Sequence, residues 1–179
     1  ADLVIVTGSQ SNVRAGYSSG TPALGVGAGN VVTIIDETAD VEDAAAKIAA
    51  SKIFDNATSC SSENAIVAVD SVYGDVVAAL RRHGGFLLDR VQSDKLKSIH
   101  WHDNKITTAL LAQDIKTVLA KMDLLETAPS DTAFLVAPQQ SIDANNPMTR
   151  EKMARFLALY RASDFEDAKS KAVAIQDIQ

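Results

Sequence analysis

The fold class is decided by Ala65-Ile66-Val67-Ala68-Val69-Asp70-Ser71, a continuous apolar run that ends in two polar residues. Such a run is typical of a strand that is buried on both faces of a sheet. Ser71 is then expected to cap a helix over residues 72–82, which the glycine pair at 84–85 ends. A buried strand followed at once by a helix is the building unit of an α/β domain.

The same alternation extends in both directions along the chain. Asp40 is expected to cap a helix over residues 41–53, because the apolar residues of this segment recur at helical spacing. Similar patterns predict strands at residues 3–6, 31–35, 86–88, 133–137 and 156–160, helices at 11–17 (capped by Ser11), 93–100 and 114–122, and a last helix begun by a capping box of Ser163 and Glu166. The sequence therefore predicts an α/β fold with a largely parallel sheet flanked by helices, whose sites lie at strand ends and in the loops that follow them.

Composition excludes several classes of function. The 179 residues carry a net charge of -6 without any block of Lys or Arg, so the chain offers no electrostatic footprint for nucleic acid or anionic lipid. Its apolar runs are far shorter than a membrane span. One cysteine forms no internal disulfide, which fits a reducing cytoplasm. His100 and His102 point to different faces of a helix, so we expect solvated histidines and no metal site. A small-molecule substrate is expected.

Cys60 is the best candidate for chemistry. It lies in a run of small polar residues, 55–64, which would fill a core poorly and suit a loop or a helix start. A nucleophilic thiol needs a lowered pKa, and moving it from about 8.5 to about 7 takes roughly 2 kcal/mol. A helix start at residues 61–63 would supply part of this energy. An inert cysteine that only fills space is the alternative interpretation.

Two glycine-containing segments invite a cofactor interpretation. Gly8 and Ser9 follow the first strand, where the amides of a strand-to-helix turn can meet a phosphate, but the residues alone favour a plain turn. Gly25, Gly27 and Gly29 do not match the dinucleotide fingerprint, because the third glycine comes one place early and a strand follows. We expect these three glycines to be structural.

Four blocks of the sequence, taken in order, resemble the aldehyde dehydrogenase superfamily and within it the coenzyme-A-acylating branch. They are residues 18–30, 36–40, 51–60 and 160–168. The resemblance implies an aldehyde-dehydrogenase-like catalytic domain that is present as a fragment. Residues 1–22 would end the nucleotide-binding domain, residues 23–154 would form the catalytic domain, and residues 155–179 would return towards the nucleotide-binding domain. The fragment alone is expected to lack turnover.

The resemblance also implies roles for particular residues. Cys60 takes the place of the nucleophile. Gly8 and Ser9 fall in the turn that abuts the dinucleotide, NAD or NADP, and Glu151 falls where an acidic residue holds a cofactor ribose. Arg155 stands where the related motif of the hydrolytic branch has proline. Coenzyme A is implied as co-substrate, a small aldehyde as substrate and a homo-oligomer as the assembled enzyme.

The hydrolytic branch carries a glutamate base in the segment that corresponds to residues 24–29, where this sequence has no carboxylate. Without a base to activate water, an acyl-enzyme can survive until a coenzyme A thiol takes the acyl group. Residues 54–64 are most similar to those of the acylating sulfoacetaldehyde enzymes. Two alternatives remain: a hydrolytic aldehyde dehydrogenase that yields a free acid, and a non-catalytic α/β interaction domain.

Overall fold

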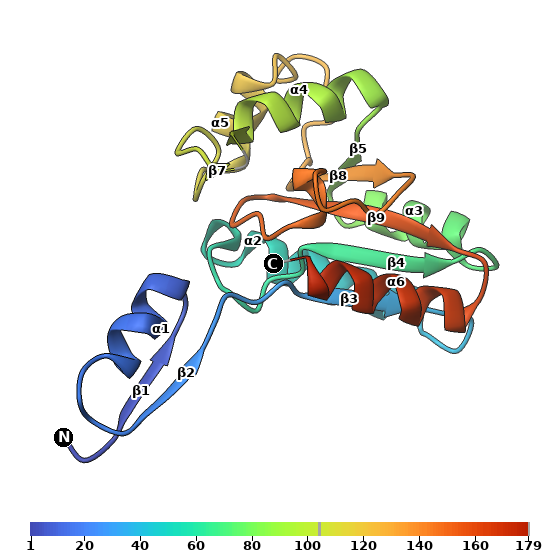
Figure 1. Ribbon diagram of the computed structural model, residues 1–179. Helices are drawn as coiled ribbons and strands as arrows, with labels where there is room; N and C mark the ends of the chain where they lie inside the picture. The colour runs from blue at the N-terminus through green and yellow to red at the C-terminus, as the bar shows by residue number, and fades with distance from the viewer. Residues whose placement is uncertain (104, 179) are drawn as a thin grey trace. The chain divides into compact units, whose positions relative to one another are not determined.

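A computed structural model describes residues 1–103 and 105–178 (Figure 1). The described chain forms two compact units, residues 1–29 and residues 30–178. Each unit has its own sheet. Within the described residues, no helix is long and apolar enough to cross a membrane.

The first unit is a strand-helix-strand motif. Strand β1 (Val4–Thr7) pairs in parallel with β2 (Ala23–Val26), and helix α1 (Gln10–Tyr17) connects them. Gly25 allows close packing, because a Cβ there would lie 2.6 Å from a methyl group of Val13. The cap of α1 is Ser9, whose Oγ accepts a hydrogen bond from the amide of Asn12 at 3.3 Å. The prediction of Ser11 as the cap was wrong.

The second unit is built on a five-stranded sheet in which every neighbouring pair is parallel. Its order is β3-β4-β9-β8-β5, from β3 (Val32–Ile35), β4 (Ala65–Val69), β5 (Gly85–Leu87), β8 (Phe134–Gln139) and β9 (Phe156–Ala162). β6 (Trp101–His102) and β7 (Lys105–Ile106) form a separate antiparallel pair. All five residues of β4 are buried, as the apolar run predicts. The predicted fold class is confirmed.

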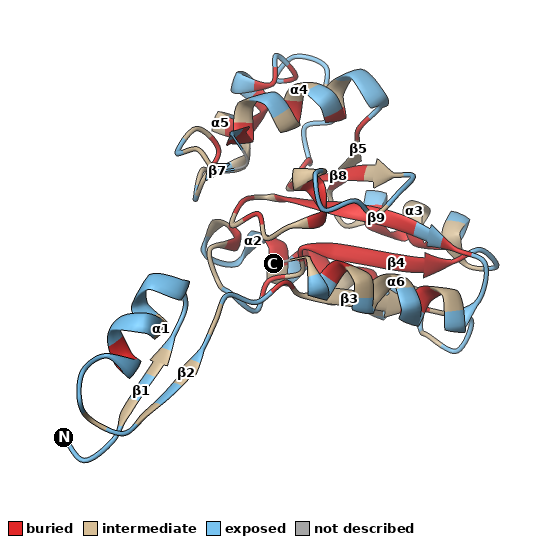
Figure 2. Ribbon diagram, viewed as in Figure 1, coloured by how far each residue is buried: buried red, intermediate tan, exposed pale blue. Residues whose placement is uncertain are grey.

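Helices cover both faces of this sheet. Ile66 and Ala68 of β4 pack with α2 (Val41–Ile53) and α3 (Tyr73–Arg82). The alternate residues of the strand face a second core with α4 (Arg90–His100), α5 (Ile115–Lys121) and α6 (Phe165–Asp177). Figure 2 shows the buried strands between helices whose outer faces are exposed. This alternation with a period of two explains why each β4 side chain reaches a core.

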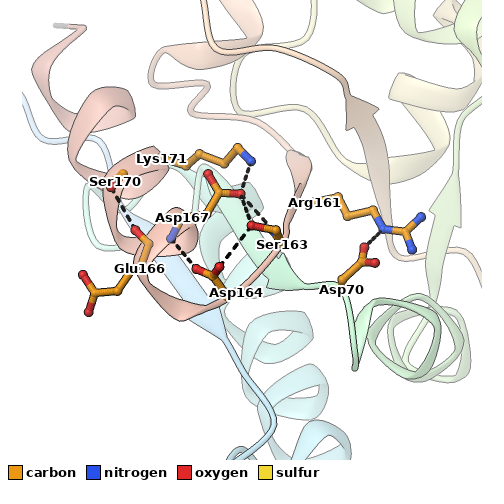
Figure 3. A network of polar contacts seen from close by, with 8 residues as sticks. All are labelled: Asp70, Arg161, Ser163, Asp164, Glu166, Asp167, Ser170 and Lys171. Carbon is orange, nitrogen blue, oxygen red and sulfur yellow. Dashed lines mark hydrogen bonds and ion pairs between the residues drawn. The ribbon is translucent and has the colours of Figure 1, made fainter.

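Side-chain caps fix where most of these helices begin. Asp40 caps α2 as predicted, and its Oδ1 accepts from the amide of Asp43 at 3.0 Å. Helix α6 begins at a different cap from the predicted Ser163: Asp164 accepts from the amide of Asp167 at 2.9 Å (Figure 3). Ser71 does not cap α3, which has no side-chain cap bond. The cap of α6 is thus the residue after the predicted one, and α3 begins one residue later than predicted, so that Val72, which has no polar side-chain atom, holds its cap position.

Candidate active site

We define the thiol loop as residues 54–64, the segment that joins α2 to β4. The residue after it, Ala65, pairs with Ala158 of β9 in parallel register. The segment before β9, which contains Glu151 and Arg155, therefore shares the amino edge of the sheet with the thiol loop. Both segments precede their strands, so this candidate site lies at the opposite edge from the strand ends where α/β folds commonly place sites, as the position of Cys60 between a helix and a strand predicts.

The thiol loop begins with a left-handed turn. Asp55, Asn56 and Ala57 have φ angles of 45°, 52° and 61°, although none of them is glycine. The left-handed conformation costs an L-residue about 1–2 kcal/mol. Three in succession persist only where surrounding contacts hold them, and such strained segments cluster at functional sites.

Arg155 supplies these contacts. Its Nε donates to Oδ1 of Asn56 at 2.8 Å, and its Nη2 donates to the carbonyl of Ile53 at 3.1 Å, at the end of α2. Asn56 also donates through Nδ2 to the carbonyl of Ala112 at 3.1 Å. The guanidinium that stands in place of a proline thus ties the strained turn to the start of β9.

The other end of the loop is held by buried polar groups. Asn64 is buried, and its Oδ1 accepts from the backbone amide of Lys152 at 3.0 Å. Nζ of Lys52, at the end of α2, donates to the carbonyl of Glu63 at 3.0 Å. Burial lowers the pKa of the Lys52 amine to about 7. These contacts anchor the segment that immediately follows Cys60.

Cys60 itself is exposed between the two anchored ends. Residues 59–62 form a turn, in which the amide of Ser62 donates to the carbonyl of Ser59 at 3.0 Å. No helix begins after Cys60, because the chain passes from this turn into β4. The prediction of a helix start at residues 61–63, with its dipole near the sulfur, was therefore wrong.

The predicted cofactor residues lie in both units. Glu151 is partly buried in the second unit, and burial raises the pKa of its carboxyl group. It immediately precedes Lys152, whose amide reaches the thiol loop. Gly8 and Ser9 are exposed in the first unit, where Gly8 has a φ of 118° and open space around the position of a Cβ.

Comparison with known proteins gives a consistent result, although no family model matches. The chain is 43% identical over 175 residues to an acylating sulfoacetaldehyde dehydrogenase of Cupriavidus necator, covering 98% of this chain and 36% of that protein. It is 39% identical over 171 residues to a bifunctional aldehyde-alcohol dehydrogenase of Escherichia coli K12, covering 96% of this chain and 19% of that protein. The crystal structure of an acetylating aldehyde dehydrogenase from Geobacillus thermoglucosidasius matches with a TM-score of 0.92 and 31% identity, over 99% of this chain and 39% of that one.

The chain is a homologue of the CoA-acylating aldehyde dehydrogenases. The resemblance inferred from the sequence blocks is thereby confirmed. The chain spans less than two fifths of the length of each of these three relatives.

The burial of four polar residues around the thiol loop was not predicted from the sequence: Lys52, Asn64, His100 and Lys152. Lys52 had a detectable signal, since it lies four residues after Ile48 on the apolar stripe of α2. His100 was expected to be solvated. It is fully buried instead, with Nε2 2.7 Å from the carbonyl of Lys152 and its ring edge-on to Trp101 and Phe156. Nothing in the local sequence identifies that distant carbonyl as its partner.

Ion pairs lie at the carboxyl edge of the five-stranded sheet. Asp70 at the end of β4 pairs with Arg161 of β9, and Asp167 pairs with Lys171 at 2.5 Å (Figure 3). A hollow of about 780 Å³ at this edge is lined by Tyr73, Arg161 and other polar residues. Within residues 1–103 and 105–178, no group of three or more His, Cys, Asp or Glu is placed to hold a metal ion.

Proposed function

We propose that this chain carries the thiol of an enzyme that oxidises a small aldehyde to an acyl-CoA and passes the hydride to NAD or NADP. The observation that carries the proposal is an exposed cysteine on a strained loop that is anchored at both ends, in a chain homologous to acylating aldehyde dehydrogenases. Strain in three consecutive residues of the loop that carries the cysteine, 55–57, is better explained by presentation of the thiol than by core packing.

Cys60 acts as the nucleophile in this proposal. Its sulfur attacks the aldehyde carbon, and a C–S bond forms while the thiol proton is released. NAD or NADP, when bound, accepts the hydride that leaves this carbon. The resulting thioester is attacked by the thiol of coenzyme A, the bond to Cys60 breaks, and the Cys60 sulfur takes back a proton. Atoms and electrons balance without a further reactant.

Coenzyme A is favoured over water because residues 24–29 contain no carboxylate to serve as the base. In the hydrolytic alternative, a base would have to come from elsewhere in the enzyme. The substrate we propose is sulfoacetaldehyde, which the name of the Cupriavidus necator relative specifies. The small residues around Cys60 suit a compact aldehyde.

Gly8, Ser9 and Glu151 are proposed to hold the dinucleotide. A phosphate could approach the backbone at Gly8 closely, because the space that a side chain would take there is empty. The first amides of α1 have no partner within the helix. The Glu151 carboxylate is suited to accept hydrogen bonds from ribose hydroxyls.

The proposal extends to the organisation of the whole enzyme. We propose that residues 1–22 belong to the nucleotide-binding domain and residues 23–154 to the catalytic domain, with β2 (Ala23–Val26), which pairs with β1, at the junction. We propose that residues 155–179 lead back towards the nucleotide-binding domain after they contribute β9 and α6 to the unit built on the five-stranded sheet. We also propose a cytoplasmic homo-oligomer without nucleic-acid or membrane partners, which the single cysteine and the acidic net charge support.

Product analysis of the full-length protein tests this function. The enzyme is incubated with sulfoacetaldehyde or acetaldehyde and NAD or NADP, with and without coenzyme A. We expect steady reduction of NAD or NADP to require coenzyme A and to yield an acyl-CoA, and we expect Cys60→Ala to abolish both. Free acid formed equally fast without coenzyme A would establish the hydrolytic alternative, and full activity of Cys60→Ala would remove Cys60 from the mechanism.

A further inference from the structure

Two lysines are fully buried next to the candidate site, and the proposed reaction uses neither. Lys52 and Lys152 both have 0% exposed surface. A fully buried lysine is rare in proteins, because its amine must leave water. The cost of desolvating a buried amine offsets much of what its hydrogen bonds contribute, so its presence is weak evidence for a role in stability. The presence of two of them calls for an explanation other than stability.

Lys152 holds the segment that carries Glu151 in one conformation. Its Nζ donates to the carbonyls of Met148 at 2.8 Å and Arg150 at 2.7 Å, which folds residues 148–152 around the amine. Its own carbonyl lies 2.7 Å from Nε2 of His100, which donates to it. The carbonyls on either side of Glu151 are therefore both held, that of Arg150 by Lys152 and that of Lys152 by His100.

The same residue reaches the thiol loop from the other side. The backbone amide of Lys152 donates to Oδ1 of Asn64, while Lys52 holds the adjacent carbonyl of Glu63. Burial and the proximity of Lys52 keep the pKa of the Lys152 amine well below its usual value. One buried cluster, Lys52, Asn64, His100 and Lys152, thus contacts both the thiol loop and the Glu151 segment.

We propose that Lys152 is a positioning residue that fixes Glu151 and the Cys60 loop relative to each other, so that the proposed dinucleotide site and the thiol are set by one buried cluster. The inference rests on the proposed function of Glu151 and Cys60. Lys52 supports the same arrangement from the loop side. Neither lysine touches the reacting atoms.

The test compares Lys152→Met, Lys52→Met and Glu151→Gln in the full-length enzyme, with Lys47→Met as the matched control at a lysine whose side chain is 75% exposed. Two readouts need no turnover. One is the dissociation constant for NADH or NADPH, whichever the unsubstituted enzyme binds more tightly, by fluorescence titration. The other is the rate of iodoacetamide alkylation of the Cys60 peptide at pH 7. Urea unfolding reports stability.

We expect Lys152→Met to weaken dinucleotide binding by about tenfold and to change the rate of Cys60 alkylation by at least about threefold, in an enzyme that its urea transition shows to be folded. Glu151→Gln should weaken binding and leave alkylation unchanged, and Lys47→Met should change neither quantity. A Lys152→Met enzyme that folds and changes only one readout, or neither, overturns the coupling.

Lys52→Met keeps the inference testable should Lys152→Met fail to fold. It is expected to change the alkylation rate by at least about threefold, and an unchanged rate would overturn the inference. Neither readout involves aldehyde or coenzyme A. An absent link between the Glu151 segment and the thiol loop is therefore distinguishable from an incorrect reaction, which product analysis and Cys60→Ala test separately.

Discussion

Replacing Arg155 by alanine should release the left-handed turn that precedes Cys60. The substitution removes the hydrogen bonds of the guanidinium to Oδ1 of Asn56 and to the carbonyl of Ile53. Bonds from a charged donor contribute about 1.5–3 kcal/mol each when buried, and Arg155 is partly exposed, so about 1 kcal/mol each is appropriate. The left-handed conformation costs Ala57 about 1–2 kcal/mol, and it costs Asp55 and Asn56 less because their short polar side chains tolerate this region. Losing about 2 kcal/mol of support should open the loop without unfolding the sheet.

Hydrogen exchange measured by mass spectrometry on the full-length protein provides the assay. A loss of 2 kcal/mol corresponds to exchange about 30-fold faster for the protected amides of residues 54–64, including Thr58, which donates to the carbonyl of Asp55 at 3.1 Å. Peptides from β4 should be unaffected. Arg82→Ala is the matched control. Arg82 forms an ion pair with Glu42 at the surface, and its loss should lower the free energy of unfolding by less than about 1 kcal/mol.

A change of less than about threefold in loop exchange on Arg155→Ala, or an equal acceleration of the same peptides by Arg82→Ala, would show that Arg155 does not hold the turn. An Asn56→Ala variant adds a consistency check. Since both substitutions remove the same contact, the effect of the double variant should be smaller than the sum of the single effects.

Three further predictions concern stability. Ile66→Ala should lower the free energy of unfolding by about 3 kcal/mol, because this side chain of β4 is fully buried against α2 and α3. A urea midpoint close to that of the unsubstituted protein would contradict this packing. Asp40→Ala should cost about 1 kcal/mol through loss of the α2 cap, measured in the same way, and no cost would mean that the cap bond is not formed in solution. Burial lowers the pKa of His100 from 6.5 to about 4. Between pH 6.5 and pH 4 the unfolded chain therefore binds a proton at this histidine that the folded protein does not. The free energy of unfolding should fall by at most roughly 3 kcal/mol as the pH drops through this range. Urea midpoints across this range should decline less steeply in His100→Phe, and an equal decline would show that His100 is not the group responsible.

The fold could be read from the sequence where local pattern alone determines it. The strand at 65–69 and the helix at 41–53 were predicted with their observed bounds, because an unbroken apolar run and a regular apolar stripe leave few alternatives. The caps of α1 and α6 were missed, since several Ser and Asp residues compete there and only the backbone direction selects one.

The polar chemistry of the site depended on partners far away in sequence. Asn64 meets Lys152, Asn56 meets Arg155 and His100 meets the carbonyl of Lys152, at separations of 88, 99 and 52 residues. No local sequence pattern pairs such distant groups, so Lys52 and Lys152 were not recognised as buried. The helix predicted after Cys60 was wrong for the same reason, because the contacts that hold the turn there come from residues far away in the sequence. Cys60 could be singled out because its neighbours are poor core residues, a property that the local sequence does contain.

Mass spectrometry of the acyl-enzyme tests the central claim most directly. The full-length protein is incubated with aldehyde and NAD or NADP without coenzyme A, quenched in acid, digested and mapped. We predict an acyl group on the peptide that contains Cys60, and its loss within one turnover when coenzyme A is added before the quench. An unmodified Cys60 peptide in an enzyme that still reduces the dinucleotide would contradict the account.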